Sequence, residues 1–417
     1  MKLLAYIAIL FFCGSSFAQH ITEVSIQDNK KTKTGFLRKI TNVKEGEKLD
    51  STVLEQDIVR IKRLPGIAHA YYQVNQKDDG NFQVVYGVEE NFTIIPSANV
   101  FTTNDDEFAY RLGLFEFNVL GQGIVFGGSF QRDIYNSYGI NFRAPYLFSK
   151  KFGIALNHNN LTTLEPVFFD NTTADYKYNN TSYEVLGLYE FNFNHRIELG
   201  VNFFTEDYEY ISGATNPNVP QELLVDKMLY KLYYEYNNVE SYYQYRDGFK
   251  SSFNFQYVIS TDESLPEFLI GFNDFVYYDR IGEKGNWASR LRLGIASNND
   301  SPFAPFAVDN NLNVRGVGNA IDRGTAAIVL NTEYRHTLYE KNWFVLQGNV
   351  FVDGGSWRNP GGDFSDFVDS KNLRIYPGVG VRFIHKRIFN TVFRIDYGYG
   401  ITKDATNGFV FGIGQYF

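Results

Sequence analysis

The chain has 417 residues and a formal net charge of −8, with 44% hydrophobic and 17% aromatic residues. The acidic balance argues against a nucleic-acid partner, because phosphate binding depends on clustered Lys and Arg side chains. A mean hydropathy of −0.28 argues against a bundle of membrane-spanning helices. The single cysteine, Cys13, lies in an apolar leader, so a processed chain would have no thiol for disulfides, thiolate metal sites or nucleophilic catalysis.

Residues 1–18 have the pattern of a secretory signal peptide. Lys2 supplies a short positive end, 3–12 form the apolar core, and small residues at Ser16 and Ala18 suit a cleavage site. A buried N-terminal helix is the alternative reading. A lipoprotein anchor at Cys13 is disfavoured, since bulky Phe12 stands where a small residue is expected.

Residues 20–91 predict a small α/β domain. The helix expected over 51–64 has Asp50 or Ser51 as its N-cap and ends at the break Pro65-Gly66. The other expected elements are a strand at 21–27, a helix at 34–40, and strands at 68–74 and 82–88 joined by a hairpin turn. The order β-α-α-β-β resembles a POTRA domain, the periplasmic module of outer-membrane assembly and secretion barrels. A generic α+β domain is the alternative.

Residues 92–417 show strand patterns and no helical periodicity. The aromatic excess and the 36 glycines favour many strands with tight turns. We expect sixteen strands, at 92–103, 108–119, 123–132, 137–148, 152–164, 181–193, 196–211, 222–237, 240–260, 268–281, 286–298, 325–339, 343–355, 372–384, 390–402 and 408–417. The boundary near residue 237 is the least defined.

Alternation and connection length together predict how these strands close. Apolar and polar residues alternate along each strand, as where Ile395 and Tyr397 flank Asp396, but a soluble sandwich alternates too. Connections after even-numbered strands are short, whereas several after odd-numbered strands are long, at 163–181, 212–221, 299–324 and 355–371. This asymmetry is typical of outer-membrane barrels. The predicted fold is therefore mainly β, an antiparallel transmembrane barrel of about 16 strands preceded by the small domain.

The sixth long loop carries the most specific motif of the chain. It contains Val314-Arg315-Gly316-Val317, and the next strand but one carries Phe351, Asp353 and Gly355. Residue parity places Asp353 on the polar face of its strand, and Glu333 and Arg335 on the polar face of strand twelve. An arginine can grip a carboxylate through two hydrogen bonds, and a confined lumen screens such a pair less than bulk water does. We therefore expect the loop to fold inward and Arg315 to pair with Asp353.

With these motifs the chain resembles the BamA/TamA superfamily. In that family the sixth loop carries Val-Arg-Gly followed by Phe or Tyr, and its Arg pairs with an acidic residue of a Phe-x-Asp-x-Gly strand. Val317 departs from the aromatic at the last position, and one POTRA domain is fewer than the family's housekeeping factors carry. The terminal Phe417 resembles the C-terminal recognition signal of outer-membrane barrels. The resemblance implies an outer-membrane barrel with its N-terminal domain in the periplasm.

The resemblance also implies insertion or translocation of other proteins, by way of a seam between the first strand (92–103) and the last (408–417). Glycines in the last strand would let this seam open, and an open strand edge can recruit an incoming strand. The implied partners are outer-membrane lipid, unfolded or secreted client proteins, and periplasmic or lipoprotein partners of the POTRA domain. A passive channel or anchor barrel and a dedicated two-partner-type secretion pore are the alternatives.

Enzymatic motifs are absent from the sequence. The 6 histidines are scattered without metal-binding spacing, and neither a nucleophile elbow nor a phosphate loop occurs. Acidic clusters such as 105–107 are expected to be solvated turns. We expect no catalytic activity, no cofactor and no metal.

Overall fold

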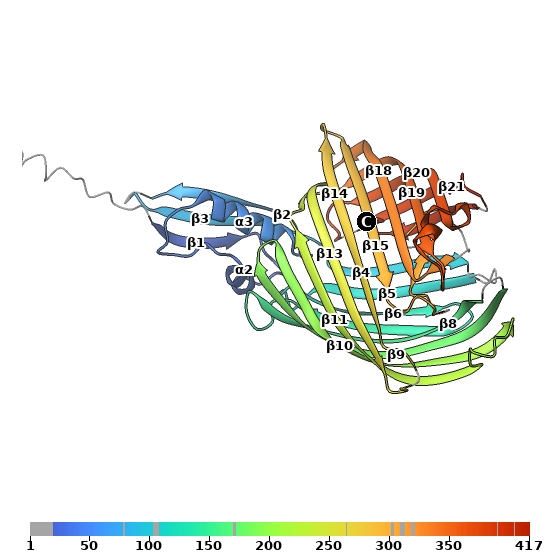
Figure 1. The fold of residues 1–417 in the computed structure, drawn as a ribbon. Coiled ribbons are helices and arrows are strands. Elements are labelled where there is room, and N and C mark those ends of the chain that lie inside the picture. Colours follow the sequence, from blue (N-terminus) through green and yellow to red (C-terminus); the bar gives the residue numbers. More distant parts are fainter. Residues whose placement is uncertain are drawn as a thin grey trace, which may run out of the picture.

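The computed structural model describes residues 20–417, except 78–79, 103–107, 170–171, 264, 302–303, 309–312, 318–321, 390 and 404. A small α/β domain lies at one end of a β-barrel (Figure 1). The predicted signal peptide lies outside the described residues. Within the described part, no helix combines the length and apolar character needed to cross a membrane.

The N-terminal domain packs two helices on a three-stranded sheet. The sheet order is β1-β3-β2, with β1 (Ile21–Gln27) parallel to β3 (Phe82–Glu90) and β2 (Ile67–Gln76) antiparallel to it. The helices α2 (Thr34–Ile40) and α3 (Ser51–Lys62) bury apolar side chains against this sheet. The predicted order β-α-α-β-β matches this arrangement.

Both ends of helix α3 are explained by nearby residues. The Asp50 carboxylate accepts a hydrogen bond from the Thr52 amide at 2.8 Å, which satisfies one free N–H of the first turn. The helix ends at Lys62, so the predicted end at residue 64 is wrong by two residues. Pro65 explains the earlier end, because a proline disfavours helical geometry in the residue before it.

The barrel wall consists of sixteen main antiparallel strands. Their bounds are β4 (Ile94–Thr102), β5 (Phe108–Val119), β6 (Ile124–Arg132), β7 (Asn136–Ala144), β8 (Phe152–Phe169), β9 (Thr172–Asn192), β10 (His195–Gly213), β11 (Glu222–Asn237), β13 (Tyr245–Ser260), β14 (Phe268–Ile281), β15 (Gly285–Ala296), β18 (Ala326–Lys341), β19 (Phe344–Arg358), β20 (Leu373–His385), β21 (Val392–Tyr399) and β22 (Asn407–Ile413). The strand order returns to its start with β22 beside β4, and this junction is the one unsealed seam of the wall.

Apolar side chains face outward and polar side chains face the lumen. On β20, Val379 is 58% exposed, whereas Arg382 is fully buried. On β21, Phe393 is 52% exposed and Asp396 is fully buried. This inversion, with charges inside and apolar groups outside, distinguishes a lipid-embedded barrel from a soluble sandwich.

The predicted long loop at 163–181 is wrong, because β8 and β9 continue through it to Phe169 and from Thr172. Among the described residues of this range, Asn179 acts as a cross-strand partner. Asn179 donates through its side chain to the Thr162 hydroxyl at 2.7 Å. Tyrosines and threonines favour the extended conformation here, so β8 and β9 pair over 18 and 21 residues.

Two other strand predictions need correction. The predicted strand 240–260 is interrupted at Tyr243, whose φ of 50° makes a turn between the short β12 (Glu240–Tyr242) and β13. The predicted strand 408–417 ends at Ile413. Gly414 then adopts a φ of 95°, and the segment 414–417 turns away from the wall.

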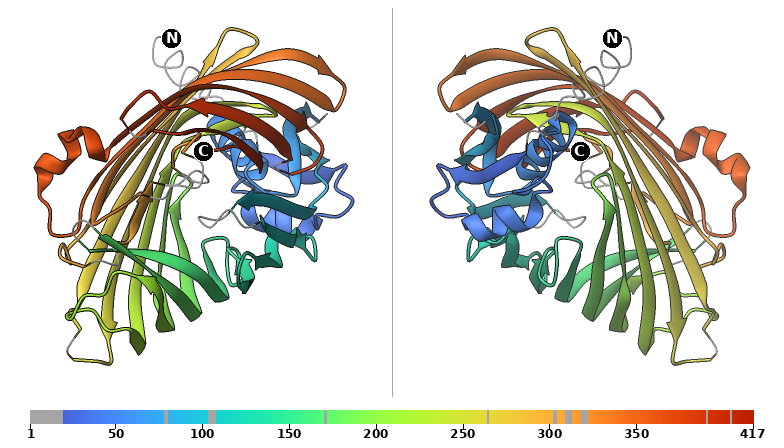
Figure 2. Two further views of the ribbon diagram at one scale, coloured as in Figure 1. Left: turned by 90° about the vertical axis from the view of Figure 1, so that its right-hand side faces the viewer. Right: turned by 90° about the vertical axis from the view of Figure 1, so that its left-hand side faces the viewer.

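The N-terminal domain is docked on the turns at one mouth of the barrel (Figure 2). Arg63, just after α3, donates to the carbonyl oxygens of Phe193 and Asn237, both at 2.8 Å. Arg60 forms an ion pair with Glu190 at 2.7 Å. The domain therefore contacts the connections that follow β9 and β11, and its orientation is defined by buried polar contacts.

Candidate functional site

The sixth long loop lies against the inner wall. Its two ends pair as short strands, β16 (Phe306–Val308) and β17 (Asp322–Gly324). Val314 and Val317 are buried, and they pack with wall residues in an apolar cluster of Val308, Val314, Val317, Val329, Trp357 and Tyr376. Val317, which stands where the resembling family has an aromatic, thus still contributes an apolar side chain to the contact.

Glycines allow the loop to approach the wall closely. Gly316 has a φ of 102°, and a Cβ there would lie 2.7 Å from the Tyr376 ring and 2.8 Å from Gly398. A Cβ on Gly355 would lie 2.9 Å from Val308 and 3.1 Å from Val314. Larger residues at either position would push the loop off the wall.

Arg315 is completely buried and bound to Asp353 in several ways. Its backbone N–H and its Nε both donate to Oδ2 of Asp353, at 2.9 and 2.7 Å, and its Nη2 donates to Oδ1 at 2.9 Å. The guanidinium and carboxylate therefore form a bidentate pair, with the main chain adding a third bond. This contact holds both the side chain and the backbone of the loop to β19.

Two further carboxylates face the same guanidinium. Arg315 Nη1 donates to Glu333 Oε2 at 2.6 Å and lies 3.6 Å from Asp396 Oδ1. The register of β18 and β19 places Glu333 opposite Phe351, two residues from Asp353, so two carboxylates project side by side. We call Arg315, Asp353, Glu333 and Asp396 the latch.

Two aromatic rings lie against the arginine of the latch. The Arg315 guanidinium lies 3.7 Å from the Phe351 ring centroid and 4.6 Å from that of Tyr416. A cation over a ring face is attracted by the ring quadrupole, most strongly where water is excluded. Phe351 comes from the wall, whereas Tyr416 comes from the segment after the last strand.

Three more arginines balance the carboxylates of the latch. Arg335 pairs with Glu333, Arg382 donates to Glu333 at 2.9 Å, and Arg394 donates to Asp396 at 3.3 Å. All are buried on the polar faces of their strands. A buried ion network of this kind gains little net stability when complete, but loses about 3–5 kcal/mol when one partner is removed.

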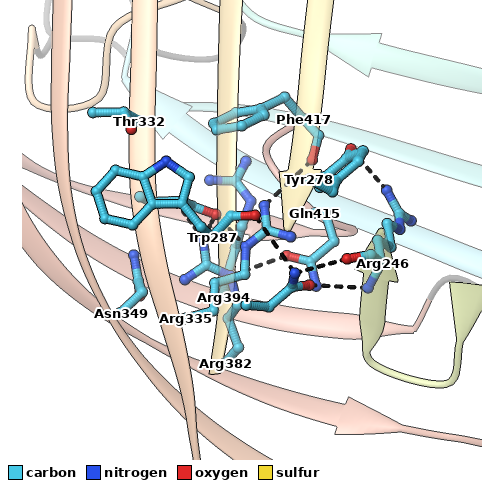
Figure 3. A network of polar contacts seen from close by, with 12 residues as sticks. Arg246, Tyr278, Trp287, Thr332, Arg335, Asn349, Arg382, Arg394, Gln415 and Phe417 are labelled. Carbon is cyan, nitrogen blue, oxygen red and sulfur yellow. Dashed lines mark hydrogen bonds and ion pairs between the residues drawn. The ribbon is translucent and has the colours of Figure 1, made fainter. Parts of the chain in front are cut away.

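Gln415 and Phe417, from the segment 414–417 that follows β22, lie among the arginines of this network (Figure 3). The side-chain oxygen of Gln415 accepts a hydrogen bond from Arg382 Nε at 3.0 Å, and a main-chain oxygen of Phe417 accepts one from Arg335 Nη2 at 3.4 Å. The Phe417 ring packs against buried residues of β14 and β15. The predicted location of Phe417 on the last wall strand is therefore wrong.

Sequence reasoning did not connect Arg382, Asp396 and Tyr416 to the site. The polar parity of β20 and β21 indicated that Arg382 and Asp396 face the lumen, but not that they meet the sixth loop. Tyr416 carried no signal, because an uninterrupted strand was expected there. Among the described residues, no group of three or more His, Cys, Asp or Glu is placed to hold a metal ion.

Comparisons with known proteins identify the family. The Omp85 superfamily domain matches residues 118–417, and a POTRA family described as "surface antigen variable number repeat" matches residues 19–91. The chain belongs to the Omp85 superfamily. It is an outer-membrane β-barrel with one POTRA domain.

Solved structures of Omp85 barrels share this fold. BamA from Haemophilus ducreyi lacking POTRA domains 1–3 is 16% identical with a TM-score of 0.57, over 95% of this chain and 84% of that one. CdiB from Acinetobacter baumannii is 12% identical with a TM-score of 0.63, over 95% and 74%. CdiB from Escherichia coli is 11% identical with a TM-score of 0.60, over 94% and 75%. At these identities the likeness concerns the fold alone.

Proposed function

We propose that this Omp85 barrel inserts or translocates client proteins at the outer membrane through the seam between β22 and β4, with its POTRA domain in the periplasm. The observation that carries the proposal is the seam itself. β22 has 7 residues and β4 has 9, whereas β9 and β10 have 21 and 19. Gly408 and Gly412 further weaken packing along β22, since a glycine in a strand has no side chain to pack.

Contacts between the POTRA linker and the barrel close the periplasmic end of the seam. The Phe92 N–H donates to the Arg387 carbonyl at 2.9 Å, and the Phe389 N–H donates to the Phe92 carbonyl at 3.1 Å. Glu89 pairs with Arg387 beside them. We call these contacts the seam clip.

The seam clip couples opening of the seam to the position of the POTRA domain. Releasing two backbone hydrogen bonds costs about 1 kcal/mol each, well below the cost of separating two long paired strands. An opened edge of β4 would present free N–H and C=O groups to an incoming strand. A POTRA domain that moves when it binds a client would pull on Phe92 directly.

A disulfide across the seam clip tests the proposal. Phe92 and Ile388 form an isolated parallel bridge, so Phe92→Cys with Ile388→Cys brings two thiols within bonding range. Residues 19–417 contain no cysteine that would compete. We expect oxidation to block client assembly in proteoliposomes and a reductant to restore it.

The matched control joins two strands that remain paired in either state. Tyr397→Cys with Phe409→Cys links cross-strand neighbours of β21 and β22 without spanning the seam. We expect its oxidised form to assemble clients normally. Full assembly by the oxidised clip variant would refute the proposal, and a large steady conductance unaffected by the clip disulfide would identify a passive channel instead.

Depletion of the protein, followed by an outer-membrane proteome, separates the modes of transport. Loss of many barrel proteins would indicate general insertion. Loss of one secreted protein would indicate a dedicated secretion pore. An unchanged proteome would contradict both.

A further inference from the structure

A polar groove of about 620 Å³ opens between the POTRA domain and the periplasmic rim of the barrel. One side is formed by Asn42 and by Gln56 and Arg60 of α3. The other side is formed by Lys150, by Lys151 and by the connection between β9 and β10. The groove exists only because the POTRA domain is docked, since its two sides come from different domains.

The two lysines are the cations of the groove that lack an acidic partner. Lys150 donates to the side-chain oxygen of Asn42 at 3.0 Å, and Lys151 to the Phe191 carbonyl at 3.0 Å. Among the described residues, no carboxylate forms an ion pair with either lysine, whereas Arg60 pairs with Glu190. Each ammonium has three N–H donors, so both retain donors for a further acceptor.

An exposed apolar face adjoins the groove on the outer surface of the barrel. Phe148 is 61% exposed, Phe152 44% and Phe191 49%, and Leu147 and Tyr189 are also exposed. The Phe148 and Phe152 rings lie 5.5 Å apart, and Tyr189 is paired with Phe152 across β8 and β9. Aromatic side chains at strand ends mark the level of the lipid headgroups.

We propose that this groove binds the phosphate headgroup of an anionic phospholipid from the periplasmic leaflet, with the acyl chains on the adjoining aromatic face. The lysines supply the charge, and Asn42 and Gln56 supply neutral hydrogen-bonding groups from the POTRA side. A soluble protein ligand would have no use for the apolar face, whereas a phospholipid matches both surfaces at once. The site is independent of the transport role proposed above.

Binding would also stabilise the docked POTRA domain. A ligand that contacts both sides of the groove binds the docked arrangement better than any undocked one, so it shifts the population towards docking. Basic residues near an anionic membrane surface each contribute about fivefold to binding. Removing both lysine charges should therefore weaken binding about thirtyfold.

Native mass spectrometry of the full chain tests the site, using phosphatidylglycerol and phosphatidylcholine with identical acyl chains. We expect wild type to retain phosphatidylglycerol preferentially and Lys150→Gln with Lys151→Gln to lose that preference. Lys284→Gln with Lys341→Gln removes two exposed lysines elsewhere on the same rim, one in a turn and one at the end of β18, and should keep the lipid preference. Gln56, exposed on α3, allows opposite changes at one position: Gln56→Glu should weaken binding and Gln56→Lys should strengthen it.

Several results would overturn the proposal. These are equal retention of both lipids by wild type, an equal loss in the two lysine pairs, and no opposing effect of the two Gln56 variants. Displacement of phosphatidylglycerol by millimolar inorganic phosphate would show a soluble-anion site in place of a lipid site. Heat-modifiable migration verifies folding, and if the lysine pair variant does not fold, the Gln56 variants decide the question.

Discussion

Two regions of the barrel wall differ sharply in how their strands are held together. The wall formed by β18, β19 and β20 has strands of 16, 15 and 13 residues and carries the fully buried latch. The seam has strands of 9 and 7 residues and is closed at the periplasmic end by the seam clip. The difference suggests that the wall of β18, β19 and β20 resists deformation, whereas the seam between β22 and β4 opens more easily.

The segment 414–417 is the physical link between these two regions. It continues β22, and its Tyr416 covers Arg315 of the latch. A displacement of this segment would therefore act on the latch directly through Tyr416, and on the arginines around it through Gln415 and Phe417. The following predictions test this contrast, from the largest expected effect to the smallest.

Arg315→Ala should destabilise the barrel by about 3–5 kcal/mol, because it leaves buried carboxylates of the latch without their shared partner. Urea unfolding of the refolded barrel, followed by tryptophan fluorescence, measures the loss. Arg323→Ala removes an arginine from a more exposed pair with Glu165 and should cost about 1 kcal/mol or less. An equal loss of unfolding free energy in both variants would mean that the latch stabilises the wall no more than an ordinary ion pair does.

The same Arg315→Ala variant separates a structural from a functional latch. If the latch only stabilises the barrel, a variant that still folds should assemble clients at the wild-type rate. We expect client assembly to fall even when it is normalised to the amount of folded variant. Heat-modifiable migration measures that folded amount. Full folding together with full assembly would remove the functional role.

Gly316→Ala should cost about 2–3 kcal/mol, since the residue has a positive φ and its Cβ would contact Tyr376 and Gly398. Gly282→Ala is the control, because its φ is 60° and no atom lies within 4 Å of the added Cβ. That control should cost about 1 kcal/mol, the conformational part alone. Similar unfolding free energies for both variants would contradict close contact between loop and wall.

Tyr416→Leu should cost about 1–2 kcal/mol by removing the aromatic face from Arg315 and Arg394. Phe411→Leu changes an outward residue of β22 and should cost about 0.5 kcal/mol or less. Combining Tyr416→Leu with Arg315→Lys should give a non-additive change in the unfolding free energy. Strict additivity would show that the seam segment and the latch are independent.

The smallest effect concerns pH and the POTRA domain. Burial raises the pKa of Glu90, but hydrogen bonds from the amides of Lys31, Thr32 and Lys30 outweigh it and lower the pKa below 4.5. A lowered pKa means that the contribution is present above pH 4.5 and is lost as pH falls through the folded-state value. The stability difference between wild type and Glu90→Gln should therefore shrink from pH 7 to pH 3. A stability difference that stays constant between pH 7 and pH 3 would exclude a stabilising role for the ionised Glu90.

Much of the fold was predictable from local pattern. Period-two alternation located the barrel strands, and the cap at Asp50 and the break at Pro65 bounded a helix correctly within two residues. These signals succeed because they act within a few residues of sequence. The prediction of a loop at 163–181 failed for the opposite reason, since Asn179 there bonds to Thr162 on the partner strand, a contact that local sequence does not show.

The candidate site was predictable in part. The motifs around Arg315 and Asp353 indicated their contact, which the structure contains, whereas its role in transport stays a prediction. The number of ion pairs was not predictable, because Glu333, Asp396 and Arg382 reach the latch through strand register. Register depends on how neighbouring strands shift along one another, and that is a property of the closed barrel.

The sequence by itself determined the strand periodicity, the small N-terminal domain and the motif residues that meet in the lumen. Only the tertiary structure decided which lumen-facing charges meet, where the chain leaves the wall after Ile413, and how the POTRA domain docks. The physical reason is the range of the interactions. Backbone propensity and alternation are local, but burial of a charge, closure of a sheet and docking of a domain depend on residues brought together from distant parts of the chain.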